Sequence, residues 1–456
     1  MEIIIISASL MAVTFIGWNA LRLIGRGNRG LCIAEEAALS YILGIGLISM
    51  EMLLFYFFGI PLRPVFILAP WIVPIAVNVA LRNLVIIFPA RGDSSRPKAG
   101  IFRMLLMFGI AFETAYTFFR ALIKPIESYD AVAIYAIKSK MFYMAGAITS
   151  DIFNAIKALY PHPDYPLNIP LAETFFYLCM GSLNDQIVKI IFPLFFVAVL
   201  VMIYFAVRRF ASSTYALIFV FILASIPQFN AYAANAYHEL PLACYYFASA
   251  VFLFRWFDNP GETWCLPLSA LLVGLAGWTK NEGLLYCVVN MAVLGVFVGS
   301  NFRKIGNKSI IYAAVYPVIV LALLLPWVVV KKTYGFVNSD VSLSCLNPQY
   351  VLSQLNRFGP IFYEFQKQFF GPKKWNLIWP AAAVIIAFNY KKAFSGVGKY
   401  MALSIALAVS GYILFYLISY VDVVYFLSKT WARFLLHFLP LVVYWLAFIL
   451  KDEVKV

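Results

Sequence analysis

Long apolar stretches alternate with short polar or basic segments along the whole chain. Most of these stretches approach about 20 residues, the length with which a helix crosses a hydrocarbon layer of about 30 Å. The predicted spans are residues 3–23, 37–59, 65–88, 101–122, 187–207, 215–232, 241–257, 266–277, 284–299, 310–330, 377–388, 400–420 and 434–450. Glu2 rather than a basic cluster precedes the first span, so we expect a retained span and not a signal peptide. The pattern predicts an all-α polytopic membrane protein with about 13 transmembrane helices.

Residues 127–166 form the longest interval in the first half of the chain that cannot span a membrane. The charged residues that interrupt this interval are Lys138, Lys140, Asp151, Lys157 and Asp164. The interval is nevertheless too apolar and aromatic for an ordinary solvated loop. We therefore expect interfacial helices that lie along the membrane surface. Residues 167–183 are too short and too punctuated for a clear span, and they predict a further interfacial or re-entrant helix.

Basic segments between the spans set the expected orientation, because short loops rich in Lys and Arg stay in the cytoplasm. Residues 22–29 and 91–98 are such segments, so the amino terminus and the segment after residue 123 are expected outside. The carboxyl terminus is then inside. This divides the chain into an N-terminal four-helix membrane extension, residues 1–122, and a second membrane domain, residues 123–456. The second domain has an interfacial loop at 123–185 and an external loop at 331–375.

Composition agrees with this pattern. Of the 456 residues, 63% are hydrophobic and 12% are charged, whereas about a quarter of a soluble domain is charged. The net charge of +14 would suggest nucleic acid in a soluble protein, but much of it lies in the short loops. Topology explains this charge, and no nucleic-acid partner is expected. The six cysteines show neither CxxC pairs nor metal-ligand spacing, which predicts buried free thiols.

Ionisable residues gather at the predicted external edge of the spans. A charge at the bilayer centre costs about 2.5 to 3.5 kcal/mol on insertion scales, so polytopic proteins keep charges at the edges. The residues expected at this edge are Glu127, Asp130, Lys138, Lys140, His162, Asp164, His238, Glu239, Lys280, Glu282, Arg433 and His437. Two of them, Asp130 and Glu239, are acids close to span ends. A pair of carboxylates there is suited to deprotonate an acceptor hydroxyl or to hold a divalent cation.

Each candidate also has a purely structural interpretation. Asp130 is placed to cap a helix, and Glu239 to act as an end charge of its span. Lys280 and Glu282 are placed to pair across a turn. Arg433 and His437, four residues apart, share a helix face and suit either a lipid phosphate or a structural bridge. The sequence has no nucleophile elbow, P-loop, dinucleotide fingerprint or HExxH motif, so the usual soluble hydrolase and nucleotide chemistries are unsupported.

Five short motifs follow one another on the predicted external face. They are YDAVAIYAIKSKMFY from Tyr129, HPDYPLNIPLAE from His162, YHELPLA from Tyr237, WTKNEG from Trp278 and RFLLHFLP from Arg433. In this order they resemble glycosyltransferases of the C-type membrane fold (GT-C). This superfamily includes protein mannosyltransferases, aminoarabinose transferases and oligosaccharyltransferases. The likeness runs over residues 127–440, and the second membrane domain is accordingly expected to be GT-C-like and catalytic.

The resemblance implies transfer of a sugar from a polyprenyl-phosphate carrier to an acceptor hydroxyl, with inversion at the anomeric carbon. Asp130 matches the first-loop aspartate, as catalytic base or metal-proximal acid, and Glu239 matches the second acid. Many relatives have Asp at the second position and no histidine beside it, which leaves the use of a divalent cation, Mg or Mn, open. Lys280 and Arg433 become candidates for the lipid phosphate. The other implied substrate-binding residues are Asp164, Tyr165, His238, Glu282, His437 and Glu127.

Other functions remain in competition with this one. A transporter or flippase for a lipid-linked sugar would share the anionic-lipid site, but it predicts charges along a path near mid-span. A ligase or polymerase of lipid-linked saccharides would suit the long loop at 331–375. The four spans before Asp130 depart from the family pattern, since typical members begin the catalytic loop after their first span. The expected location is the plasma (inner) membrane, with the active site on the external or periplasmic face and a glycan, lipid or protein as acceptor.

Overall fold

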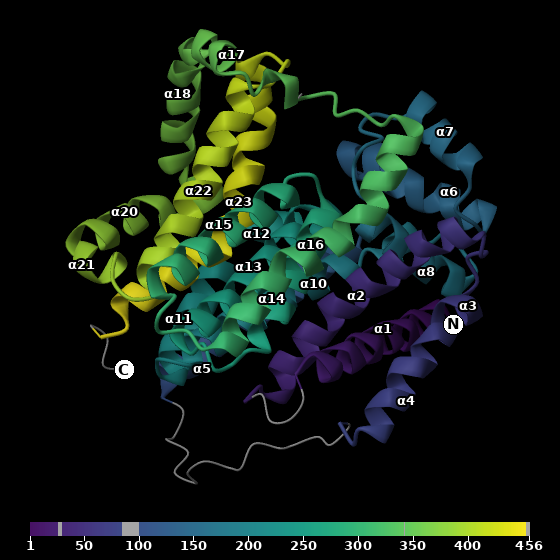
Figure 1. Ribbon diagram of the computed structural model, residues 1–456, viewed down its shortest axis with the longest axis horizontal. Helices are drawn as coiled ribbons and strands as arrows, with labels where there is room; N and C mark the ends of the chain where they lie inside the picture. Colours follow the sequence, from purple (N-terminus) through teal and green to yellow (C-terminus); the bar gives the residue numbers. More distant parts are fainter. Residues whose placement is uncertain (26–29, 84–99, 342, 453–456) are drawn as a thin grey trace.

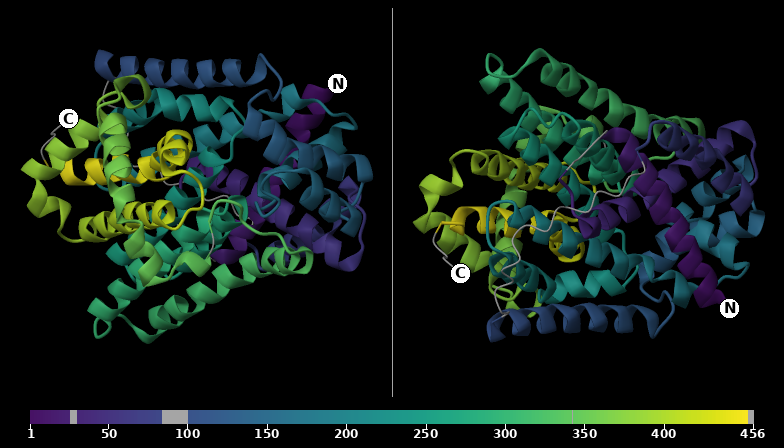
Figure 2. Two further views of the ribbon diagram at one scale, coloured as in Figure 1. Left: turned by 90° about the horizontal axis from the view of Figure 1, so that it is seen from above. Right: turned by 90° about the horizontal axis from the view of Figure 1, so that it is seen from below.

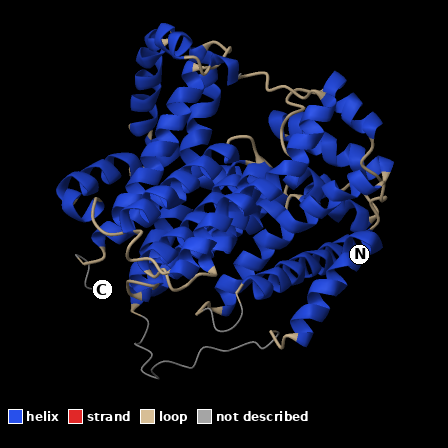
Figure 3. Ribbon diagram, in the orientation of Figure 1, coloured by secondary structure: helices blue, strands red, loops and turns tan. Residues whose placement is uncertain are grey.

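The computed structural model describes residues 1–25, 30–83, 100–341 and 343–452. Within these residues the chain forms helices and no strand, apart from one isolated bridge between Val341 and Ser419 (Figure 1, Figure 3). The prediction of an all-α membrane protein is confirmed. The basic segment 91–98, most of the basic residues of 22–29 and the end of the third expected span lie outside the described residues.

The first part of the chain contains two long helices that cross closely. Its elements are α1 (Glu2–Ile24), α2 (Ile33–Phe58), α3 (Pro64–Leu68), the 3₁₀ turn η1 (Ala69–Trp71), α4 (Ile72–Ala80) and α5 (Ile101–Leu122). A Cβ on Gly17 of α1 would lie 1.8 Å from the Ser40 carbonyl oxygen, and one on Gly44 of α2 would lie 1.9 Å from that of Val13. Only glycine permits this approach, as in other small-residue helix crossings.

The expected interfacial region is a set of short helices. They are the π-helical turn η2 (Ala131–Ala136), α6 (Ile137–Ala145), α7 (Ser150–Leu159), α8 (Asn168–Met180) and α9 (Asp185–Val188). The helix α8 is almost entirely buried and packs against α2 and α6. It therefore lies inside the protein, where its neighbours cover a segment too short to cross the membrane.

The central part of the chain carries the most deeply buried helices. Its elements are α10 (Ile191–Arg208), α11 (Ser213–Ala224), α12 (Pro227–Ala234), α13 (Glu239–Asp258), α14 (Cys265–Thr279), α15 (Gly283–Asn301) and α16 (Asn307–Tyr334). The helix α13 is buried over nearly its whole length, packed by α10, α14 and α23. By contrast, α5 is mostly exposed and lies along one edge of the molecule in both views of Figure 2.

The last part of the chain rises above the bundle and returns through its core (Figure 1). Its elements are η3 (Leu343–Cys345), α17 (Pro348–Ser353), η4 (Leu355–Arg357), α18 (Phe358–Phe369), α19 (Pro372–Trp375), α20 (Ile378–Phe388), α21 (Tyr390–Ala393), α22 (Gly398–Leu417) and α23 (Val423–Leu450). The expected loop at 331–375 is therefore largely helical. Its helix α18 packs against α23, which carries Arg433.

Helix length supports fewer membrane crossings than the hydropathy pattern predicts. In the described part of the chain, nine helices are long and apolar enough to cross a membrane, or ten if α11 and α12, bent by 69°, form one broken span. Three shorter apolar helices, Pro64–Ala80, α14 and α20, coincide with further predicted segments. Every predicted span thus overlaps a helix, but the expected count of 13 crossings is not confirmed.

Charged residues pair with one another at the end of the bundle predicted to face the cytoplasm. Arg22 binds Glu36 at 2.6 Å, and Arg209 binds Glu35. These contacts join the end of α1 to the start of α2, and the start of α2 to the end of α10. The opposite end holds most of the candidate site residues.

Candidate active site

Five ionisable side chains from distant parts of the chain form one continuous network. Arg433 Nη1 lies 2.5 Å from Asp130 Oδ2 and 3.7 Å from Glu239 Oε1. Lys280 Nζ lies 3.0 Å from the same oxygen of Glu239 and 2.8 Å from Glu282 Oε1. The order of contacts is Asp130, Arg433, Glu239, Lys280, Glu282, which we call the ionic network. The structure thus brings together both predicted acids and both predicted phosphate ligands.

The network has an open edge and an enclosed part. The side chains of Asp130 and Arg433 are 21% and 20% exposed. Glu239 and Lys280 are 0% and 3% exposed. A substrate approaching from outside therefore meets Asp130 and Arg433 first, with Glu239 and Lys280 behind them.

Asp130 stands where the chain enters the π-helical turn η2. Its side chain makes no capping hydrogen bond to that turn and accepts from Arg433 instead. The alternative interpretation of Asp130 as a helix cap is therefore wrong. Single π-helical turns within helices often occur at functional sites, because the extra residue changes the direction of the side chains.

Glu239 and Lys280 are positioned by helix ends. Glu239 is the first residue of α13, and Lys280 directly follows α14. Burial by itself lowers the pKa of Lys280, but the carboxylates of Glu239 and Glu282 outweigh it, so the pKa lies above its usual value. Lys280 consequently stays charged, and the predicted pairing of Lys280 and Glu282 across the turn is present.

Arg433 lies on α23, with its guanidinium carbon 5.0 Å from the centre of the Tyr237 ring. Tyr237 immediately precedes His238 and Glu239 in the chain, so this stacking and the contact with Glu239 anchor Arg433 to the same short segment. A guanidinium held by an aromatic face and two carboxylates has a fixed orientation.

Asp164 organises the loops around the network without joining it. Its Oδ2 accepts hydrogen bonds from Asn281 at 2.6 Å and from Asn338 at 3.0 Å. Its backbone oxygen accepts from the Trp327 indole at 3.3 Å. Asp164 therefore ties the loop containing Lys280 to the loop after α16.

A column of stacked rings lies beside the network. His162 stacks on Tyr165 with ring centres 4.8 Å apart, Tyr165 on Tyr135 at 6.0 Å, and Tyr135 on His238 at 3.5 Å. Burial, followed by the charges of Lys280 and Lys138, lowers the pKa of His238 well below its usual value. His238 is neutral and is not a cationic ligand for phosphate.

Two further predicted site residues, His437 and Glu127, also lie outside the ionic network. His437 is fully buried, and its Nδ1 lies 2.8 Å from the hydroxyl of Tyr412. Although His437 shares a helix with Arg433, the two do not form one basic site, because His437 lies a turn deeper in the protein. Glu127 is exposed and pairs with Lys124 at 3.3 Å.

Sequence reasoning missed the neutral residues that orient the charged ones. They are Tyr135, Tyr237, Asn281 and Asn338. Three of them lie inside or beside quoted motifs, since Tyr135 belongs to the first, Tyr237 opens the third and Asn281 lies between Lys280 and Glu282. Asn338 lies in the loop after α16, in a segment for which the sequence offered no signal.

One comparison with known proteins gives a match to this part of the chain. Residues 164–329 match the model of the dolichyl-phosphate-mannose-protein mannosyltransferase family, a family of the GT-C type. The match supports a membrane glycosyltransferase of the GT-C type. The matched segment includes Glu239, Lys280 and Glu282, whereas Asp130 and Arg433 lie outside it. No curated protein and no solved structure matches the chain.

The carboxylates of the ionic network do not fit a divalent cation in this arrangement. Asp130 and Glu239 are both bound by Arg433, whose guanidinium lies where a shared metal ion would have to lie. No group of three or more His, Cys, Asp or Glu side chains is placed to hold a metal within the described ranges. We therefore derive no step through a metal ion.

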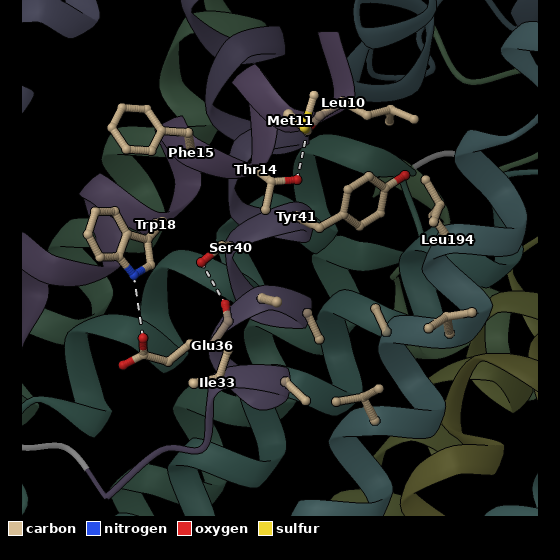
Figure 4. A pocket seen from close by; sticks show the side chains of 16 residues that line it. Leu10, Met11, Thr14, Phe15, Trp18, Ile33, Glu36, Ser40, Tyr41 and Leu194 are labelled. Atoms are coloured by element: carbon tan, nitrogen blue, oxygen red, sulfur yellow. Dashed lines mark hydrogen bonds between the residues drawn. The ribbon is translucent and has the colours of Figure 1, made fainter. Parts of the chain in front are cut away.

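An apolar pocket of about 670 Å³ lies between α1, α2 and α10, away from the ionic network (Figure 4). Leu10, Phe15, Tyr41 and Leu194 contribute to its lining. The one carboxylate there, Glu36, accepts from the Trp18 indole at 3.4 Å and pairs with Arg22. This pocket has no acid or base left for catalysis.

Proposed function

We propose that the glycosyltransferase moves a sugar from a polyprenyl-phosphate carrier to an acceptor hydroxyl, with inversion at the anomeric carbon. The observation that carries the proposal is the open edge of the ionic network, where a carboxylate and a guanidinium stand side by side. Transfer of a glycosyl group from a phosphate requires both functions, a base for the acceptor and a cation for the leaving group.

Asp130 is assigned the role of general base. Its carboxylate accepts the proton of the acceptor hydroxyl while the acceptor oxygen forms a bond to the anomeric carbon. The bond from that carbon to the phosphate oxygen breaks, and the phosphate leaves with the electron pair. Attack from the face opposite the phosphate gives inversion.

Arg433 is assigned to the phosphate, because it is the more accessible of the two cations. Lys280 is already enclosed between Glu239 and Glu282. We assign Lys280 and Glu239 to positioning Arg433, and Lys280 adds positive potential behind it. Asp164 and Tyr165 support the loops that surround these groups.

The proposed orientation follows from the loops. The basic residues of the opposite end belong in the cytoplasm by the positive-inside rule. The ionic network then faces the external or periplasmic side of the plasma membrane, where a lipid-linked donor and a glycan, lipid or protein acceptor would meet.

The test is Asp130→Asn, assayed in proteoliposomes with a panel of polyprenyl-phosphate sugars and hydroxyl acceptors. Asparagine keeps the shape of the side chain but cannot accept the proton. We expect the transfer rate to fall by at least about a hundredfold, with donor binding retained. Asp151→Asn, an exposed acid on α7, serves as the matched control and should transfer at the wild-type rate. Transfer by Asp130→Asn at the wild-type rate would refute the role.

A transporter is distinguished in the same proteoliposomes. A flippase would move the lipid-linked sugar across the bilayer without forming a new glycosidic bond. Translocation without transfer, unaffected by Asp130→Asn, would favour the flippase over the glycosyltransferase.

A further inference from the structure

A basic pocket lies beside the ionic network and shares no residue with it. The pocket has a volume of about 260 Å³ and is formed by the end of α5, the loop that follows, Lys189 between α9 and α10, and the end of α12. Its ionisable lining residues are Arg120, Lys124, Lys189 and Glu127. Three cations against one carboxylate give a net charge of +2. We call it the basic pocket.

Two of the three cations of the basic pocket, Lys189 and Arg120, are held by the protein around them, whereas Lys124 is exposed and pairs with Glu127. Lys189 is only 4% exposed, and its Nζ donates to the carbonyl oxygens of Lys124 at 3.1 Å and Pro125 at 3.2 Å. Arg120 donates to the Asn230 side chain at 3.4 Å. A lysine that only extended towards water would be exposed, so Lys189 is a built part of the pocket wall.

The loop between α5 and η2 is fixed in place on this side. Gln186 donates to the carbonyl oxygen of Leu122 at 2.5 Å, which joins α9 to the end of α5. On α12, Asn230 also donates to Thr117 of α5 at 2.7 Å. The pocket is thus preorganised by polar contacts on both sides of α5.

A separate, mainly apolar groove lies further along α5, between α5, α10 and α11. It has a volume of about 390 Å³ and is lined by Met107, Ile110 and Thr114 of α5, by Val197 and Leu200 of α10, and by residues of α11. These α5 residues precede Arg120 by 6 to 13 positions, which places them about 9 to 20 Å further along the helix axis. The groove therefore lies deeper in the membrane than the basic pocket, and its one charged lining residue, Arg103, lies at the end of the groove far from that pocket. The helix α5, which forms one wall of the groove, lies along an exposed edge of the molecule (Figure 2).

We propose that α5 and α10 form a binding site for a phosphate-bearing lipid, with the phosphate in the basic pocket and a hydrocarbon chain in the apolar groove. Guanidinium and ammonium groups bind phosphate oxygens through charge-assisted hydrogen bonds. The apolar groove about two helical turns further along α5 suits the hydrocarbon chain of a lipid, which a soluble phosphate lacks. This site stands whether or not the chain transfers sugars, because it depends on none of the five network residues.

The site is tested by lipid binding to the purified full-length protein in detergent. The probes are a polyprenyl monophosphate, phosphatidylglycerol and the corresponding polyprenol without phosphate, each titrated and counted by native mass spectrometry. In the double variant Arg120→Gln, Lys124→Gln, we expect affinity for at least one phosphate lipid to fall about tenfold or more, since two charged donors are lost. Affinity for the polyprenol should not change.

Controls separate this effect from unfolding and from general loss of charge. Lys332→Gln removes an exposed lysine at the same end of the bundle, outside the pocket, and should bind all probes like the wild type. Lys124→Gln alone removes an exposed side chain and leaves the contacts of Arg120 and Lys189 in place. It should show a smaller loss in the same direction, with an unchanged melting temperature.

The pattern of losses identifies the source of the phosphate. Loss for polyprenyl monophosphate alone supports a site for the carrier lipid, and loss for both phosphate lipids supports a general anionic-lipid site. Unchanged affinity for both, or an equal loss for the polyprenol, overturns the proposal. Binding measured without acceptor does not depend on turnover, so this result is independent of the Asp130→Asn assay.

Discussion

At the scale of single residues, Arg433 is the side chain that connects the two carboxylates. It contacts Asp130 directly and lies within 4 Å of Glu239, which is fully buried. Removal of Arg433 would leave the partly buried carboxylate of Asp130 without its partner, whereas Glu239 would keep Lys280. An unpaired buried charge is far more costly than the loss of an exposed ion pair. Arg433 therefore links the stability of the site to its proposed chemistry.

Two substitutions of Arg433 separate its contribution to stability from its contribution to the proposed reaction. Arg433→Gln should lower the free energy of unfolding by roughly 3 kcal/mol and abolish transfer. Arg433→Lys keeps the charge but lacks the rigid planar guanidinium, whose Nη1 contacts both acids, so it should recover most of the stability and little of the rate. Melting temperature and transfer rate, measured on the same preparations, test this. Full activity in Arg433→Lys would show that only charge matters.

Lys138, on α6, should make the free energy of unfolding depend on pH, and a single substitution can isolate this contribution. Its Nζ is fully buried and donates to the carbonyl oxygen of His162 at 3.0 Å. Burial, only partly opposed by Asp164, lowers the pKa of Lys138 from 10.5 to about 7. Between these two values the unfolded chain binds a proton that the folded protein does not.

The free energy of unfolding should therefore rise with pH from about 7 towards 10.5, where both states become neutral at this residue. Below about pH 7 both states are protonated, so the residue adds no slope. Lys138→Met should remove this part of the pH dependence. Thermal unfolding of wild type and variant in matched buffers from pH 6 to pH 10 measures the difference, and parallel curves would contradict the assignment.

At the scale of elements, the crossing of α1 and α2 depends on the absence of two side chains. Gly17→Ala would place a Cβ against the backbone of Ser40, where no side-chain rotation relieves the overlap. We expect a loss of stability of about 1 to 3 kcal/mol. Gly295→Ala on α15 is the matched control, because a Cβ there meets nothing within 4 Å. It should be neutral or slightly stabilising, as alanine favours helices.

The sequence predicted the charged residues of the site better than it predicted their environment. Motif order and the positive-inside rule predicted that Asp130, Glu239, Lys280 and Arg433 lie at one end of the bundle. In the structure these four side chains are in contact. The spacing of Arg433 and His437 also suggested a shared site, but spacing along a helix does not tell how deeply each turn is buried. The burial of α8 depended on contacts with α2 and α6, which are remote in sequence.

At the scale of the whole molecule, the two ends of the bundle carry different charge arrangements. One end has the ionic network and the basic pocket, and the other has the ion pairs of Glu35 and Glu36 with arginines. Single cysteines test the sidedness that we propose. Asp151→Cys should react with an impermeant thiol reagent in intact cells, and Lys304→Cys, exposed at the opposite end, only after permeabilisation. The reverse pattern would place the site in the cytoplasm.

The contact between Asp130 and Arg433 also bears on how the protein is made. The two residues are 303 positions apart, so at translation rates of about 5 to 20 residues per second the acid precedes its partner by roughly 15 to 60 s. During that interval Glu239 can pair with Lys280, but Asp130 has no guanidinium to hold it. The site is complete only once α23 has entered the membrane, which means that a nascent or C-terminally truncated chain cannot perform the proposed reaction.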